Sequence, residues 1–134
     1  MLDHQEALIS LMVLVSAADE HMSDRELNRM SRLVTELPVF TDFDVTKLPE
    51  TAQKCAAILA KEEGVELLLA EVVAALPTGL RETAYAIACD VAAADGRVVE
   101  PEMEILEIIR HYLSIDQLIA AGIERGARAR HARI

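Results

Sequence analysis

Residues 92–102 read AAADGRVVEPE, and residues 16–26 read SAADEHMSDRE, so the chain carries one pattern twice. In each copy an apolar run ends in an aspartate, a short loop follows, and a glutamate stands near the start of the next apolar run. Apolar residues at helical spacing on both sides predict two helices joined by a tight loop. Two such hairpins are expected to share a core about a pseudo-twofold axis. The identical pairs are Val15/Val91, Ala17/Ala93, Ala18/Ala94, Asp19/Asp95, Glu26/Glu102 and Leu37/Leu113.

Composition favours helices throughout. Hydrophobic residues make up 52% of the 134 residues but aromatic residues only 3%, so the core has to be built from Ala, Leu, Ile, Val and Met. Strands usually recruit aromatic and β-branched residues, whereas Ala and Leu favour helix. We therefore predict an all-α fold, a compact bundle of about seven helices formed by residues 1–124, followed by a basic C-terminal tail, residues 125–134.

Capping residues, prolines and one glycine place the helices. Asp3 and Glu6 predict a reciprocal cap for the first helix, which is apolar nearly all round and is therefore expected at the centre of the bundle. Pro49 and Pro101 suit the first turns of two later helices, and Gly64 separates two others. Thr78 is expected to cap the helix that ends near Ala94. Spacing assigns to the core Leu27, Met30, Leu33, Val34, Ala52, Cys55, Ala56, Leu68, Leu69, Val72, Ala84, Ile87, Met103, Leu106, Ile109, Leu113, Leu118, Ile119 and Ile123.

The loop at residues 39–46 and the basic tail each have two interpretations. Phe40 and Phe43 lie in residues 39–46 and are expected to plug one end of the core, with an exposed partner-binding loop as the alternative. The basic tail is expected to be solvated or frayed, with docking onto an acidic surface of this chain, a partner or a membrane as the alternative.

The formal net charge of −10 disfavours nucleic acid as a partner and favours cations or a basic protein surface. Cys55 and Cys89 stand in apolar helical runs without CxxC spacing, so we expect reduced core thiols. No apolar run approaches the roughly 18 residues of a membrane span. The first residues also lack the positive charge of a signal peptide, and we expect a cytoplasmic protein.

The acids of the repeat form the candidate site. Asp19 and Asp95 end helices, where the helix dipole is negative and a carboxylate is unfavourable by roughly 0.3–1 kcal/mol. Either each carboxylate accepts N–H groups of its own loop, or a hard divalent cation is held by Asp and Glu oxygens with loop carbonyls. Spacing differs from an EF-hand loop, so calcium sensing of that type is not expected.

Local capping explains one repeat glutamate better than the other. Ser23 forms a capping box with Glu26, whereas Val99 stands at the matching place before Glu102 and leaves only the helix dipole to explain that acid. Asp90, one turn before the loop, adds a third acid to the second copy. The predicted metal ligands are Asp19, Glu26, Asp90, Asp95 and Glu102, and a purely structural role for these acids stays open.

The doubled pattern, with AAADGRV at 92–98 and Glu102 as its better copy, resembles the tellurite-resistance TerB family and its TerB-like relatives over nearly the whole chain. The resemblance implies a bacterial all-helical domain of about seven helices, cytoplasmic or associated with the inner membrane through a partner, and linked to chemical stress. It also implies cation binding by Asp19 and Glu26 and by Asp95 and Glu102. Glu20 replaces the glycine that Gly96 provides, so the first loop is expected to differ in shape.

These observations lead to a prediction of a stress-response module that binds calcium, magnesium or manganese and acts as a scaffold for other proteins. The alternative is a metal-free interaction domain that docks a partner through its acidic face, the Phe40/Phe43 loop or the basic tail. An enzyme is not expected. A carboxylate-metal hydrolase would usually add histidine ligands, and His4, His21, His111 and His131 show no such spacing. The oligomeric state stays open.

Overall fold

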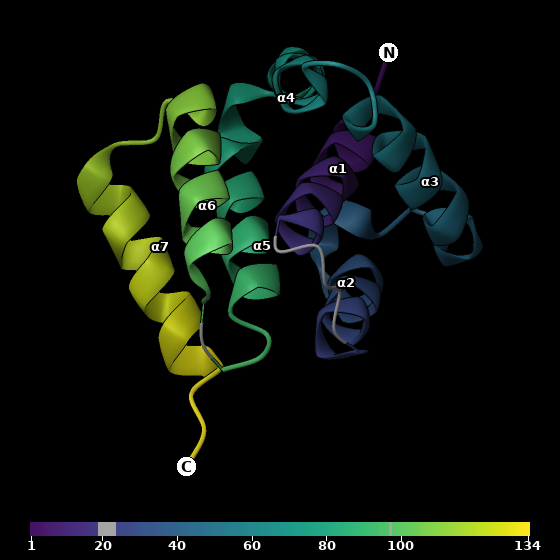
Figure 1. Cartoon of the computed structure of the whole chain (residues 1–134). Helices are drawn as coiled ribbons and strands as arrows, with labels where there is room; N and C mark the ends of the chain where they lie inside the picture. The colour runs from purple at the N-terminus through teal and green to yellow at the C-terminus, as the bar shows by residue number, and fades with distance from the viewer. Residues whose placement is uncertain (19–23, 97) are drawn as a thin grey trace.

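The structure, a computed structural model, describes residues 1–18, 24–96 and 98–134. Within these residues the chain forms seven α-helices, three short 3-10 helices and no strand, which confirms the all-α prediction (Figure 1). The 3-10 helices are Pro38–Phe40, Val45–Lys47 and Thr78–Leu80. The α-helices are α1 (His4–Ala17), α2 (Asp24–Glu36), α3 (Leu48–Leu59), α4 (Gly64–Ala75), α5 (Arg81–Ala92), α6 (Glu100–Leu113) and α7 (Gln117–Arg130).

Helix α1 is the centre of the bundle. The predicted capping box starts it, because the Glu6 N–H donates to Asp3 Oδ1 at 2.8 Å and the Asp3 N–H donates to Glu6 Oε1 at 3.0 Å. Every residue from Ala7 to Ser16 is buried. The helix contacts α2, α3, α4, α5 and α6, and Figure 1 shows it enclosed between α3 and α5. An apolar surface on all sides of α1 is therefore satisfied by neighbours on all sides.

The two repeated hairpins, α1 with α2 and α5 with α6, share this core. Helix α1 packs directly on α5. The second helix of each hairpin contacts the first helix of the other, because α6 touches α1 and α2 touches α5. These reciprocal contacts are those expected of two similar hairpins packed about a pseudo-twofold axis. The bundle is thus built from the two pseudo-repeated hairpins, and α3, α4 and α7 complete it.

The α3–α4 connection depends on a glycine. A Cβ atom at Gly64 would stand 2.2 Å from the Leu59 carbonyl oxygen, so only glycine permits this close approach of the two helices. Glu63, immediately before it, has a left-handed φ of +57°. At the other end of α3, Pro49 lies in the first turn as predicted. Ala56 is exposed rather than buried, because the buried face of α3 runs through Thr51 and Cys55.

The phenylalanine loop is part of the core. Phe40 is 2% exposed, and Phe43 packs against the core with its ring edge-to-face to Phe40 at a centroid distance of 5.9 Å. Gln5 of α1 ties this loop down by donating to the Val39 carbonyl at 3.1 Å and to Asp42 at 2.7 Å. The predicted plug is confirmed.

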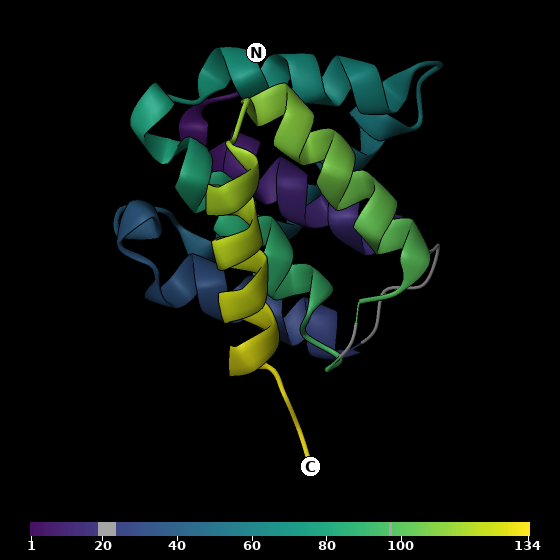
Figure 2. The same ribbon diagram turned by 90° about the vertical axis from the view of Figure 1, so that its left-hand side faces the viewer.

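The C-terminal helix differs from the sequence prediction. Helix α7 continues to Arg130, so residues 125–130 are helical rather than a separate tail. Its buried residues are Ala120 and Ala127, whereas Leu118 and Ile119, predicted to face the core, are 83% and 44% exposed. Small alanines let α7 approach α5, on which it packs (Figure 2). The side chain of Leu118 lies away from this alanine stripe.

Helix α5 starts and ends differently from the prediction. Thr78 belongs to a 3-10 turn and does not cap the helix, whose N-cap residue Leu80 makes no side-chain hydrogen bond. The helix ends at Ala92 rather than Ala94, although Ala93 and Ala94 remain buried. Among the described helices, none combines the length and the apolar character needed to cross a bilayer.

Candidate functional site

The two repeat glutamates are buried at equivalent places. Glu26 in the first turn of α2 is 1% exposed, and Glu102 in the first turn of α6 is 3% exposed. The residues next to them, Leu27 and Met103, were assigned to the core by spacing but are 49% and 52% exposed. Both helices are therefore rotated so that an acid faces inward where an apolar side chain could have done so.

Burying the glutamate instead of the neighbouring Leu or Met side chain is unfavourable in free energy. Removing a carboxylate from water is unfavourable unless it is well partnered, whereas burial of a Leu or Met side chain is worth about 1.5–3 kcal/mol. The buried face of α2 runs through Glu26, Met30, Leu33 and Val34. That of α6 runs through Ile105, Leu106, Ile109 and Leu113 below Glu102. The larger apolar residues further along each helix set its rotation, and the first-turn glutamate follows.

Glu102 has a local partner that sequence reasoning missed. Its Oε1 atom accepts the backbone N–H of Val99 at 3.4 Å, across the start of α6. The N-terminus of α6 is the positive end of its helix dipole, where a carboxylate is favoured. Val99 can provide no side-chain cap in return, so this is one half of a capping box. A cap from the glutamate alone could have been predicted from its position three residues after Val99.

Asp95 is exposed in the loop between α5 and α6. The loop turns at Gly96, which has a φ of +90° and donates its N–H to the Ala93 carbonyl at 2.9 Å. A left-handed φ favours glycine, so the tight form of this loop depends on that residue. The corresponding aspartate, Asp19, and Glu20 lie outside the described residues, and the predicted difference between the two loops is not tested.

Asp90, the predicted third ligand, contacts basic residues of the C-terminal segment. Its Oδ1 atom accepts Arg130 Nη2 at 2.6 Å and lies 3.4 Å from His131 Nε2. Nearby, Arg133 Nη2 donates to the Ala94 carbonyl at 2.7 Å. The basic C-terminal residues therefore dock onto an acid and a carbonyl of this same chain, which was one of the alternatives for the tail.

The acids of the second hairpin do not converge into a ready metal centre. Over residues 1–18, 24–96 and 98–134, no three His, Cys, Asp or Glu side chains lie close enough to hold one metal ion together. A cation at this loop would accordingly take part of its coordination from loop carbonyls or water, as calcium and magnesium commonly do.

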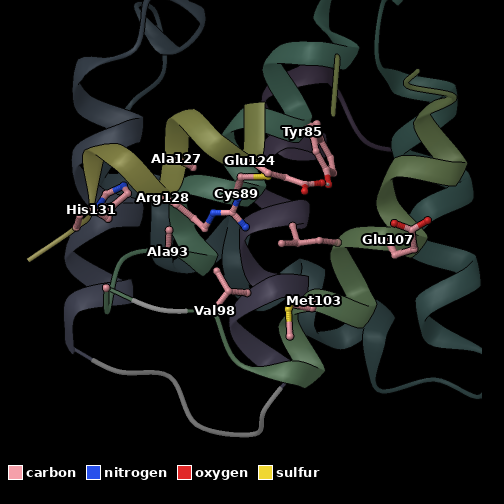
Figure 3. A pocket seen from close by; sticks show the side chains of 13 residues that line it. Tyr85, Cys89, Ala93, Val98, Met103, Glu107, Glu124, Ala127, Arg128 and His131 are labelled. Carbon is pink, nitrogen blue, oxygen red and sulfur yellow. Dashed lines mark hydrogen bonds between the residues drawn. The ribbon is translucent and has the colours of Figure 1, made fainter. Parts of the chain in front are cut away.

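Beside this loop is a cavity of about 450 Å³ between α5, α6 and α7 (Figure 3). Its lining includes loop residues Gly96 and Val98, so the candidate loop forms part of the cavity wall. Met103 also lines the cavity, although its side chain is 52% exposed. Sequence reasoning could not find this cavity, because it exists only once the length and position of α7 are known. Its further lining residues include Cys89, Ala93, Leu106, Ala127 and Arg128.

One polar pair lies at the wall of the cavity. The buried Tyr85 hydroxyl donates to Glu124 Oε2 at 2.5 Å, joining α5 to α7. Burial, with this hydrogen bond, raises the pKa of Tyr85 far above its ordinary value. Burial also raises the pKa of the neighbouring Cys89 thiol to about 12. Cys89 is thus a protonated thiol at neutral pH, a poor nucleophile and a poor metal ligand.

One protein family matches nearly the whole chain. The family model described as tellurite resistance protein TerB matches residues 5–123, from the first turn of α1 to the middle of α7. The match includes both hairpins and every predicted ligand. Neither the search of curated proteins nor the search of solved structures found a match.

Proposed function

This chain belongs to the TerB family, and we propose that it is a cytoplasmic, non-enzymatic module that binds a divalent cation and acts as a scaffold for partner proteins. The cation is calcium, magnesium or manganese. Its ligands in the second hairpin are Asp95 and Glu102, together with loop carbonyls and water. Asp19 and Glu26 are the matching pair in the first hairpin. The link to tellurite resistance comes from the family.

The main support is the glutamate that both α2 and α6 place at the buried first-turn position. Two helices that begin with different residues both bury the first-turn glutamate and expose the apolar residue beside it. The helix dipole favours an acid at such a position, but an exposed acid would satisfy the dipole equally well. Packing of the later apolar residues sets the rotation of both helices, but it does not dictate which residue type stands at the inward first-turn position. A requirement for a carboxylate at the base of each loop explains why both copies have a glutamate there.

The exposed aspartate complements the buried glutamate. Asp95 follows the negative end of α5, where a carboxylate is unfavourable, and Glu102 stands at the positive end of α6, where a carboxylate is favourable. A hard cation between them would remove the dipole penalty on Asp95 and would close the loop over the start of α6. Cation binding is then expected to raise the stability of the folded state by mass action.

Thermal unfolding with and without metal tests this proposal. After treatment with a chelator, the full chain is melted in calcium, magnesium or manganese, and we expect at least one to raise the Tm. Asp95→Asn should abolish that rise and should cost little stability without metal, because the neutral side chain no longer opposes the α5 dipole. Glu104→Gln, an exposed acid on α6 with the same charge change, is the matched control and should keep the rise.

Two outcomes would contradict the cation site. If no metal at millimolar concentration shifts the Tm of the parent chain, the acids are structural. If Asp95→Asn and the parent respond identically to every metal, any bound cation lies elsewhere.

A metal-free interaction domain is the second candidate, and exposed apolar side chains favour it. On α6 and α7 the structure exposes Ile108 at 40%, Leu118 at 83% and Ile119 at 44%. Large exposed hydrophobic residues are typical of protein-binding surfaces when they gather on one face. Leu118→Asp in an otherwise intact chain should abolish capture of a specific partner while leaving the Tm unchanged. Retention of the partner by this variant would argue against a contact through the start of α7.

A further inference from the structure

A second pocket, of about 280 Å³, lies against α2 of the first hairpin, and four of its six described lining residues are arginines. It is formed by one face of α2, by Ala94 two residues after the end of α5, and by the C-terminal segment. The lining residues are Arg25, Asn28, Arg29, Arg32, Ala94 and Arg133. Spacing along the sequence does not group these residues, because Arg133 of the basic C-terminal segment joins the α2 arginines only in the folded chain.

The three arginines of α2 lie on one stripe of the helix. Arg25, Arg29 and Arg32 are spaced by four and three residues, which places them above one another on the helix surface. Like charges at this spacing destabilise a helix, and Arg25 in the first turn also opposes the helix dipole. Local helix stability therefore does not account for this arrangement.

These arginines also lack the partners that an acidic chain could supply. The protein has 23 Asp and Glu residues against 13 Lys and Arg. Yet among the ion pairs of the described residues none involves Arg25, Arg29 or Arg32. By contrast, Arg110 and Arg130 each pair with a carboxylate. Within residues 1–18, 24–96 and 98–134, then, no carboxylate pairs with these three guanidinium groups, and their donors are available to a ligand.

The fourth arginine is held in place across the pocket. Arg133 Nη2 donates to the Ala94 carbonyl at 2.7 Å, and its guanidinium lies against Gly96, where a Cβ atom would be 3.6 Å from Cζ. One donor is used for this anchor and the others remain. A guanidinium that is already positioned loses less side-chain entropy when a ligand binds.

We propose that this pocket binds the phosphate groups of a small phosphorylated molecule of the diphosphate type. Guanidinium forks match the oxygens of a phosphate in bidentate geometry, and four of them suit a ligand with more than one negative charge. The Asn28 amide adds a neutral donor. Among the described residues, the lining contains no large apolar side chain to anchor a peptide and no aromatic ring on which a nucleic acid base could stack.

This site is independent of the proposed cation site. Its direct ligands are guanidinium groups, so binding requires no metal. The two sites are nevertheless adjacent in the chain, because Ala94 of the pocket precedes Asp95. Measurements made in excess chelator separate them: anion binding should persist there even if the cation site fails.

Inorganic pyrophosphate is the first probe, added to the full chain in chelator and followed by calorimetry and by backbone amide NMR. We expect saturable one-to-one binding that weakens as salt is raised, with shifts at residues of α2 and at Arg133. Inorganic phosphate should bind more weakly. Arg25→Gln and Arg32→Gln, both at exposed positions, should each raise the Kd about tenfold, because each removes a charge-assisted hydrogen bond.

Two further variants define the specificity of the effect. Arg29→Lys keeps the charge but removes the fork, and should also weaken binding. Arg125→Gln changes an exposed arginine of α7 outside the pocket and should leave the Kd within about twofold. Circular dichroism melts of every variant show that the fold is retained.

Three results would overturn the proposal. The first is the absence of heat and of amide shifts at millimolar pyrophosphate. The second is equal weakening by Arg125→Gln and Arg32→Gln, which would mean attraction by overall charge. The third is binding of an acidic peptide or a short RNA under conditions in which pyrophosphate does not bind, which would assign the arginines to a macromolecular partner.

Discussion

The second helices of the two hairpins have matching inner faces and different outer faces. On the inner side, α2 and α6 both bury a first-turn glutamate, Glu26 and Glu102. Beside this shared face α2 carries the arginine stripe, whereas the positions of α6 that correspond to Arg29 and Arg32 hold the buried Ile105 and the 40% exposed Ile108. The inner faces pack on the same central pair, α1 and α5, and are constrained alike. The outer faces meet different surroundings and are free to differ.

The neighbourhoods of the two hairpins explain part of this divergence. Helix α7 packs on α5 and leaves the 450 Å³ cavity beside α6, where Met103 is partly enclosed. The α2 surface faces the C-terminal segment instead, and Arg133 closes the arginine pocket there. One repeat thus borders an apolar cavity and the other a cationic pocket. An internal repeat can therefore preserve a core while its two copies border pockets of different chemistry.

The largest expected effect comes from a pair of equivalent leucines. Leu113 at the end of α6 is fully buried, whereas Leu37 after α2 is only partly buried. Leu113→Ala should lower the free energy of unfolding by about 2–5 kcal/mol, and Leu37→Ala by about half as much, because less apolar surface and volume are lost. Urea denaturation of both variants measures the difference. Equal losses would mean that the two helix ends are equally enclosed, contrary to the structure.

The next effect concerns α7. Of the described helices, α5 is the one with which α7 makes extensive contact. Ala120 is 1% exposed, and its neighbour Ala121 is exposed. Ala120→Leu should cost about 1–3 kcal/mol by forcing α7 away from α5. Ala121→Leu is the matched control and should stay within about 0.5 kcal/mol. Chemical denaturation followed by circular dichroism measures both, and similar values would place the α7 contact elsewhere.

A smaller effect distinguishes the starts of α1 and α5. Burial acts to raise the pKa of Glu6, but the Asp3 N–H and Lys54 outweigh it and hold that pKa below its usual value of 4.5. A carboxyl with a lowered folded-state pKa stabilises the fold above its usual pKa, and that stability is lost as pH falls through the folded-state pKa. The α5 start has no such side-chain cap.

Glu6→Gln should therefore cost about 1 kcal/mol at pH 7 and much less at acid pH, where the parent has lost the same contribution. Glu82→Gln, in the first turn of α5, is the control and should change stability by only a few tenths of a kcal/mol. Urea titrations at neutral and at acid pH supply the comparison. A Glu6→Gln penalty that is independent of pH would contradict the role of the carboxylate.

The smallest effect concerns the ion pair that anchors the C-terminal residues. Asp90→Asn removes the charge that Arg130 contacts at 2.6 Å, and should cost roughly 0.5–1 kcal/mol at low salt because the pair is only partly buried. The difference from the parent should shrink as salt screens the pair. Thermal melts at low and high salt measure it, and a cost that grows with salt would exclude a simple ion-pair contribution.

Several parts of the structure follow from the sequence alone. Asp3 and Glu6 predicted the start of α1, Pro49 and Pro101 predicted first turns, and Gly64 predicted the break between α3 and α4. These signals are local, because capping, proline geometry and close backbone approach depend on a few adjacent residues. The central position of α1 also followed, since a helix that is apolar on all sides needs neighbours on all sides.

The rotation of α2 and α6 was decided by the tertiary structure. Neighbouring residues on a helix point about 100° apart, so Leu27 and Met103 were as acceptable on the core side as Glu26 and Glu102 by spacing alone. Packing of the later residues on α1 and α5 selected the face that buries the glutamates. The reach of α7 to Arg130, the use of Asp90 as its anchor and the cavity beside α6 likewise depend on residues far apart in the chain. So does the arginine pocket, which exists because Arg133 is held beside α2 by the carbonyl of Ala94, a contact between segments that no local pattern connects.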